Sequence, residues 1–344
     1  MMSSRIAVVG TGANGASIGA DLVRAGLDVT FIEQWPAHVD AMRANGLAVH
    51  LPNRVEVTEV NANHLCEVAE LQTRFDIVFT SVKSYDTRWA CELIKPVIGP
   101  DSVVVGLQNG MTVDPVSEIL GVERTIGAVL GIAANLPEPG IVVRQVDRAD
   151  TWFSVGALSE RTDRVEEVAA ALAHAGVTEI SDDIRASKWM KLIANIPEML
   201  PSAILGMPLL SAERLPGVRE VMDAAAREAY AVARALGITM RPIFGKTAAD
   251  VPDSDQYALD LLDAVLADYS LPDTRVAVLQ DWEKGRRAEL DAFNGYVVGR
   301  GRELGVPVEV NRAILEIAER IESRELRPGA ENVDLLTGCG ESLH

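Results

Sequence analysis

The chain has 344 residues, of which 48% are hydrophobic and 24% charged, so we expect two globular domains with sizeable cores. Its formal net charge of −18 argues against nucleic acid or an anionic membrane as a partner, because both bind basic patches. No stretch reaches the roughly 18 apolar residues of a membrane span, and the start lacks the features of a signal peptide. The cysteines are too few and too scattered for a disulfide framework or a metal site, which predicts a cytoplasmic protein.

In the first half of the chain, short β-rich runs alternate with helical patterns. Alternation of this kind predicts right-handed crossovers and a parallel, doubly wound sheet. We expect strands at 5–10, 28–33, 76–83, 102–110, 125–131, 151–156 and 177–181, and helices at 13–25, 36–46, 86–98, 112–120 and 161–175.

The character changes after about Asp183, where strand signals end and long helical patterns begin. The last stretch lacks periodicity and is expected to be a loose tail. The sequence therefore predicts an α/β domain over 1–183, an all-helical domain over 184–326 and a tail over 327–344. The expected helices of the second domain lie at 184–205, 217–236, 256–267, 274–304 and 309–324.

The stretch "GTGANG" follows the first expected strand and opens a helix. It has the G-x-G-x-x-G pattern of a Rossmann-type dinucleotide-binding turn. The helix N-terminus offers free N–H groups and a partial positive charge to a pyrophosphate. We therefore predict that the cofactor is bound by Gly10, Gly12, Ala13, Asn14 and Gly15.

The type of dinucleotide is indicated by Glu33, which ends the second expected strand. A carboxylate there accepts hydrogen bonds from ribose hydroxyls and repels a 2′-phosphate. The next residue is Gln34 rather than a cation, so we predict NAD as the cofactor, with NADP as the alternative. Lys83, after the strand at 76–83, is expected to approach the ribose or the phosphates.

The stretch "SKWMKLIANIPEML" (187–200) is mostly apolar but has polar residues on one helical face. These are Lys188, Lys191 and Asn195, which are three and four residues apart. Lys188 is expected at the edge of the helix with a solvated head group. Lys191 suits hydride transfer to a carbonyl, because a cation stabilises the developing negative charge and supplies a proton.

Four stretches together resemble the ketopantoate reductase (2-dehydropantoate 2-reductase) family over nearly the whole chain: "GTGANG", "LQNG" (107–110), "KWMKLIAN" (188–195) and "LQDWEKGRRAELDAFNG" (279–295). The resemblance implies a Rossmann domain, a helical domain and an active site in the cleft between them. It also implies reduction of a 2-oxo acid by a nicotinamide cofactor, usually NADPH.

The resemblance assigns roles residue by residue. Lys191 resembles the catalytic lysine that polarises and protonates the carbonyl, and Glu289 resembles the carboxylate that works alongside it. Asn109 resembles the loop asparagine near the nicotinamide. Asn195, one turn after Lys191, resembles a contact to a substrate hydroxyl.

Three positions depart from the pattern of family members that act on ketopantoate. Ala277 stands where a serine helps to bind the carboxylate, Thr274 stands where asparagine is common, and Met199 stands where a second asparagine often follows. Loss of polar contacts changes which substrate fits a site. We therefore expect an NAD-preferring paralogue for a less polar or larger oxo or hydroxy acid, with these three residues lining the substrate.

Several alternatives remain open at this point. The chain could be an authentic NADPH-dependent 2-dehydropantoate 2-reductase of pantothenate biosynthesis with a divergent carboxylate pocket. It could be an opine-type imine reductase, or a dinucleotide-binding protein without catalysis. We expect a small-molecule substrate, no metal, and a homodimer as a possible assembly.

Overall fold

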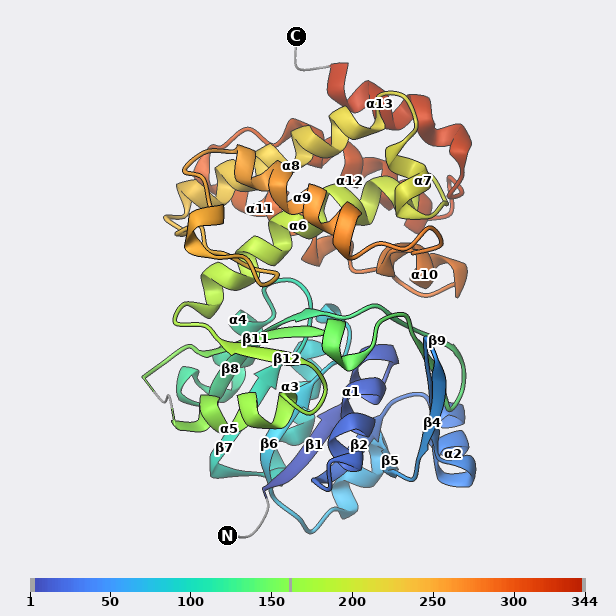
Figure 1. The fold of residues 1–344 in the computed structure, drawn as a ribbon, viewed down its shortest axis with the longest axis vertical. Coiled ribbons are helices and arrows are strands. Elements are labelled where there is room, and N and C mark those ends of the chain that lie inside the picture. The colour runs from blue at the N-terminus through green and yellow to red at the C-terminus, as the bar shows by residue number, and fades with distance from the viewer. Residues whose placement is uncertain (1–3, 161–162, 342–344) are drawn as a thin grey trace. The chain divides into compact units, whose positions relative to one another are not determined.

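The computed structural model describes residues 4–160 and 163–341 (Figure 1). By contacts within the chain it divides into two compact units, one ending at Lys188 and the other beginning at Trp189. The division falls inside helix α6 (Ile184–Ile204). The first unit is α/β and the second is helical, as the sequence predicts.

An eight-stranded sheet forms the centre of the first unit, with strand order β12-β11-β8-β7-β6-β1-β2-β5. All neighbours are parallel except β8 and β11, which are antiparallel. The fully parallel sheet that we expected is therefore wrong at this pair, because no helix crosses over between the two strands. The strands are β1 (Arg5–Val9), β2 (Asp28–Glu33), β5 (Asn61–His64), β6 (Phe75–Thr80), β7 (Ile98–Gly106), β8 (Thr125–Gly131), β11 (Trp152–Ala157) and β12 (Val177–Ile180).

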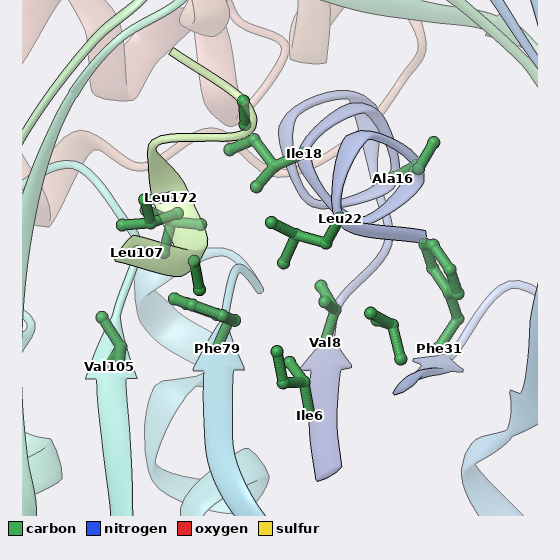
Figure 2. Packing of buried hydrophobic residues seen from close by; sticks show 14 of the residues in the cluster. Ile6, Val8, Ala16, Ile18, Leu22, Phe31, Phe79, Val105, Leu107 and Leu172 are labelled. Atoms are coloured by element: carbon green, nitrogen blue, oxygen red, sulfur yellow. The ribbon is translucent and has the colours of Figure 1, made fainter. Parts of the chain in front are cut away.

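Both faces of this sheet are covered by helices, as the near-continuous apolar strands require. Figure 2 shows Ile6 and Val8 of β1 directed toward Ile18 and Leu22 of one helix, with Leu172 of another close by. The alternate residues of β1 enter a separate core on the opposite face. The helices of this unit are α1 (Ala13–Arg24), α2 (Pro36–Asn45), α3 (Thr87–Ile94), α4 (Val113–Leu120) and α5 (Asp163–Leu172).

A second, four-stranded sheet was not expected from the sequence. Its strand order is β4-β3-β10-β9. The pattern of β3 does carry a strand signal, because Leu47, Val49 and Leu51 are buried and alternate with less buried residues. The bounds are β3 (Leu47–Leu51), β4 (Arg54–Thr58), β9 (Ala134–Glu138) and β10 (Ile141–Arg144).

A buried ion pair joins α1 to this second sheet. The side chains of Asp21 in α1 and Arg144 in β10 are both fully buried, and they form an ion pair of 2.6 Å. Arg148 also donates a hydrogen bond to Asp21, at 2.9 Å, and Arg144 donates another to the Thr151 hydroxyl. Buried charges with several partners resist separation, because removing one partner leaves an uncompensated charge.

The second unit is entirely helical from Trp189 to Glu341, apart from turns and loops. Within the described residues, no helix of the protein is long and apolar enough to cross a membrane. The helices are α6, α7 (Leu209–Glu213), α8 (Val218–Ala235), α9 (Gln256–Asp268), α10 (Ala277–Glu283), α11 (Asn294–Leu304), α12 (Glu309–Glu322) and α13 (Val333–Glu341).

The single helix expected over 274–304 is wrong, because α10 and α11 are separate helices. The first of them ends at Glu283, two residues before a glycine with left-handed backbone, Gly285 (φ +66°). The backbone N–H groups of Lys284 and Arg286 both donate to the carbonyl oxygen of Asp281 there. The charged residues at 283–291 are typical of an exposed helix face, so the sequence did not indicate that the helix ends here.

The loose tail expected over 327–344 is also wrong in its described part. Helix α13 packs against α8 and α12. Leu336 and Cys339 are buried and lie three residues apart, so they face the core of the unit together. Two glycines among the last described residues weaken the helical pattern and hid this signal.

Candidate active site

The glycine-rich turn between β1 and α1 has the geometry that a pyrophosphate requires. A Cβ on Gly10 would lie 2.6 Å from the backbone nitrogen of Val82, and one on Gly15 would lie 2.2 Å from the carbonyl oxygen of Gly10. A Cβ on Gly12 would meet nothing within 4 Å. Two glycines are thus needed for packing, and the third leaves open space in front of the first turn of α1, where Ala13 and Asn14 lie.

The N-terminus of α1 supports the same interpretation. Gly12 caps the helix without any side-chain hydrogen bond, so the first backbone N–H groups keep their capacity to donate. The turn also lies where the connections of the sheet diverge, since β1 is flanked by β2 on one side and β6 on the other. Open α/β sheets bind their ligands at this position. The residues therefore fit a bound dinucleotide.

Glu33 is directed to the glycine turn rather than to solvent. Its side chain is 6% exposed and accepts a hydrogen bond of 3.0 Å from the Thr11 hydroxyl. The other carboxylate oxygen accepts from the backbone N–H groups of Gln34 and Trp35, both at 2.9 Å. Since a carboxylate has about four acceptor sites, this one retains the capacity to accept from a ribose hydroxyl.

The loops after β6 and β7 are joined to each other by Gln108, a residue that the sequence patterns did not indicate. The buried amide of Gln108 donates to the carbonyl oxygen of Val82 at 2.7 Å and to the Thr87 hydroxyl at 2.9 Å. Lys83 directly follows Val82, and Asn109 directly follows Gln108. The structure thus brings both predicted residues to the side of the sheet that holds the glycine turn.

Lys188 is not the solvated edge lysine that we expected. Its side chain is 3% exposed, and the ammonium donates to the carbonyl oxygens of Gln108 at 2.9 Å and of Ala128 at 3.1 Å. Burial lowers the pKa of Lys188 to about 7, which the charge of Asp114 partly opposes. The lysine therefore holds the loop that carries Asn109. Helical spacing alone does not distinguish a buried lysine from a surface one.

Because the amine of Lys188 is buried, we expect the free energy of unfolding to depend on pH. Because the pKa of Lys188 is about 7 in the folded protein and about 10.5 in the unfolded chain, only the unfolded chain binds this proton between the two values. Below pH 7 the folded protein bears the full free-energy cost of burying the Lys188 ammonium. That cost is lost as the pH rises, so the free energy of unfolding increases from pH 7 to 10. We expect Lys188→Met to remove about 3 kcal/mol of that increase, as measured by urea unfolding across this pH range.

Lys95→Met is the matched control, because Lys95 is exposed and paired only with Glu92 on the surface. Its pH dependence should equal that of the wild type. If Lys188→Met also kept the wild-type pH dependence, the ammonium of Lys188 would not be desolvated.

In the second unit, one face of α6 carries a row of polar side chains, at spacings of four and three residues: Lys191, Asn195 and Glu198. Asn195 is fully buried, and neither atom of its amide has a hydrogen-bond partner among the described residues. Buried polar atoms without partners are costly, which indicates a place for a ligand. Glu198 was missed from the sequence, although it lies seven residues after Lys191.

The charged groups in this row act on each other. Burial lowers the pKa of Lys191, and the negative charge of Glu198 opposes that shift. Burial raises the pKa of Glu198 to about 7, and the positive charge of Lys191 opposes that shift. A lysine with a lowered pKa suits general acid–base chemistry.

An aromatic side chain lies beside Lys191. The amine nitrogen is 5.1 Å from the centroid of the Phe244 ring, and that ring stacks on Tyr269 with centroids 4.6 Å apart. Phe244 has a left-handed backbone (φ +61°), which a bulky residue rarely adopts. Strain of this kind concentrates at functional sites. The sequence offered no periodic signal for this residue.

The other predicted substrate residues lie in the same unit. Met199 is buried one residue after Glu198. Ala277 begins α10, and the Thr274 hydroxyl accepts a hydrogen bond from the backbone of its own turn. Glu289 is buried before a short 3₁₀ turn rather than inside a helix. In this structure the carboxyl whose charge acts on the pKa of Lys191 is that of Glu198.

Two family models together match most of this chain. Residues 6–157 match the family model described as ketopantoate reductase PanE/ApbA, and residues 183–322 match that of its C-terminal part. The 2-dehydropantoate 2-reductase of Archaeoglobus fulgidus is 29% identical, over 94% of this chain and 99% of that protein. The chain is thus an NAD(P)-dependent oxidoreductase acting on CH–OH groups. It belongs to the ketopantoate reductase family.

Solved structures show the same fold. A PanE/ApbA family ketopantoate reductase from Ralstonia eutropha is 32% identical with a TM-score of 0.79, covering 93% of this chain and 99% of that one. D-mandelate dehydrogenase in complex with NADH and anilino(oxo)acetate has a TM-score of 0.83 at 20% identity, covering 93% and 98%. At that identity the second likeness shows the fold alone.

Proposed function

We propose that this protein transfers hydride between NAD(H) and the oxo or hydroxy carbon of a small acid, with Lys191 as the general acid and base. The observation that carries the proposal is the polar row on α6, where an amine of lowered pKa lies one turn from a buried, unpaired amide. The bound nicotinamide supplies or accepts the hydride.

The residues of the chain then have distinct tasks. In reduction, the ammonium of Lys191 stabilises the negative charge that develops on the substrate oxygen and donates the proton to it. In oxidation, the neutral amine accepts that proton. Asn195 binds a polar group of the substrate through its unpaired amide, Asn109 lies near the nicotinamide, and Glu289 binds or orients the substrate.

The preference for NAD is supported by Glu33. The carboxylate is held at the glycine turn by Thr11, and the two residues that follow it, Gln34 and Trp35, are not cations. A 2′-phosphate would therefore meet a negative charge without an adjacent positive one. The phosphates would be bound by the backbone of the turn at Gly12 and by Lys83.

The substrate we propose is a 2-oxo or 2-hydroxy acid with an apolar or aromatic substituent. Met199, Ala277 and Thr274 replace polar groups of the family pattern, and Phe244 and Tyr269 add an aromatic wall beside Lys191. The structural neighbour D-mandelate dehydrogenase, which has the same fold, was solved with NADH and anilino(oxo)acetate. The second candidate is 2-dehydropantoate 2-reductase activity, which the names of several relatives favour.

A substrate screen tests the proposal. The purified protein is assayed for oxidation of NADH and of NADPH with ketopantoate, with aliphatic 2-oxo acids of increasing size and with phenylglyoxylate. We expect kcat/KM with NADH and an apolar or aromatic oxo acid to exceed that for ketopantoate with NADPH at least tenfold, about 1.4 kcal/mol in transition-state binding. Faster turnover of ketopantoate with NADPH would establish the second candidate instead.

A further inference from the structure

Glu198 has no part in the reaction as described so far. It lies two helical turns after Lys191 on the same face of α6, about 10.5 Å further along the helix axis. Residues seven apart on an α-helix lie within about 20° of one another around the axis, so Glu198 and Lys191 share one face of α6. The unpaired amide of Asn195 lies between them along the row.

Neither charged group is committed to another partner among the described residues. Among the described residues none donates a hydrogen bond to the carboxyl of Glu198, and its backbone oxygen accepts one from the Ser202 hydroxyl at 2.5 Å. From other elements, the group that faces the amine of Lys191 is the uncharged ring of Phe244, with Tyr269 behind it. No third charge contributes to the pKa shift of either side chain.

We propose that Glu198 is a positioning residue that holds Lys191 in its charged, proton-donating form. A buried carboxylate is the group that compensates a desolvated ammonium, and the two titrate as a pair rather than independently. Reduction needs the ammonium, so Glu198 extends reduction to higher pH. This inference rests on the proposed role of Lys191 in catalysis.

The pair can be observed directly by NMR, without a known substrate. The chain has only six lysines, so labelling with [ε-13C]lysine gives few signals, and the loss of one signal in Lys191→Met assigns Lys191. In the wild type, we expect the Lys191 signal to shift in two steps, one near pH 7 as Glu198 ionises and one at higher pH. A single step at the ordinary lysine pKa of about 10.4 would overturn the proposal.

Substitution separates the charge of Glu198 from its shape. We expect Glu198→Gln to lower the pKa of Lys191 by about one unit and to abolish the step near pH 7, because the compensating charge is gone. Glu220→Gln is the matched control, since it removes the same charge from an exposed position on α8 and should leave both steps unchanged. Glu198→Asp keeps the charge and should retain a step from ionisation of the carboxyl in addition to the step at higher pH. An unchanged Lys191 pKa in Glu198→Gln would overturn the proposal.

Kinetics then connect the pair with turnover. In Glu198→Gln, the alkaline limb of kcat/KM for reduction should move to lower pH by about one unit, a tenfold lower rate on that limb, while the Kd for NADH stays constant. A coupled NMR titration with full turnover in Lys191→Ala would refute the proposed function and leave the pair standing. Loss of turnover in Lys191→Ala without a coupled NMR titration would support the proposed function and refute the pair.

Discussion

Lys191→Ala is expected to lower kcat for the best oxo acid by about 10³-fold, while the Kd for NADH changes less than about twofold. The variant lacks the amine that both stabilises the oxyanion and protonates it. General acid catalysis is worth about 10²–10⁴-fold and one oxyanion donor about 10²–10³-fold, and the two are not additive when one group supplies both. Steady-state kinetics give kcat, and quenching of protein fluorescence by NADH gives the Kd. The cofactor should be unaffected because its predicted contacts lie in the first unit.

Two controls sharpen this result. Lys95→Ala removes an exposed lysine of the first unit and should keep the wild-type kcat. Added ethylammonium should restore part of the turnover in Lys191→Ala, because a small amine can occupy the space that the side chain leaves. If Lys191→Ala kept more than a tenth of the wild-type kcat, another residue would have to act as the acid.

The second large effect concerns two glycines of the same turn. Their substitution by alanine should have different effects on stability and on NADH binding. Gly15→Ala places a Cβ 2.2 Å from the backbone oxygen of Gly10, so α1 must move. We expect a loss of about 1–3 kcal/mol in the free energy of unfolding together with loss of NADH binding. Gly12→Ala meets no protein atom within 4 Å, so stability should stay within about 0.5 kcal/mol of the wild type.

Gly12→Ala should nevertheless weaken NADH binding at least tenfold, because its Cβ enters the space that the pyrophosphate needs. Urea unfolding and NADH titration on the same two preparations separate the effects. Full NADH affinity in Gly12→Ala would show that the phosphates do not approach the backbone at this residue.

Much of the main sheet could be predicted from the sequence, and the reasons are physical. Its central strands are buried on both faces and are therefore continuous apolar runs, and the glycine turn marks where the first one ends. The strand β5 was not predicted, because its four residues, Asn61–His64, are mostly polar and lie at the sheet edge. The exposed Val55 and Val57 of β4 likewise give no sign of which face is buried.

Some residues of the candidate site could likewise be predicted from the sequence, and others could not. Glycines, Glu33 and Lys191 are detectable because their chemistry requires a residue type at a fixed spacing. Gln108 and Lys188 stabilise loops through backbone carbonyl oxygens, and an acceptor of that kind leaves no trace in the side-chain sequence. Phe244 reaches Lys191 from an irregular segment that is distant in sequence, so only tertiary structure brings the two together.

The buried pairing of Asp21 with Arg144 has a consequence for the order of folding. The two residues are 123 positions apart, and the contact of Asp21 with Arg148 spans 127. Contacts of such long range form late, because the intervening loop must first be closed. During synthesis, Asp21 therefore has only Arg24 of its own helix as an ion-pair partner until about 150 residues have left the ribosome. Shorter nascent chains should bind no nucleotide, although they already contain the complete glycine turn.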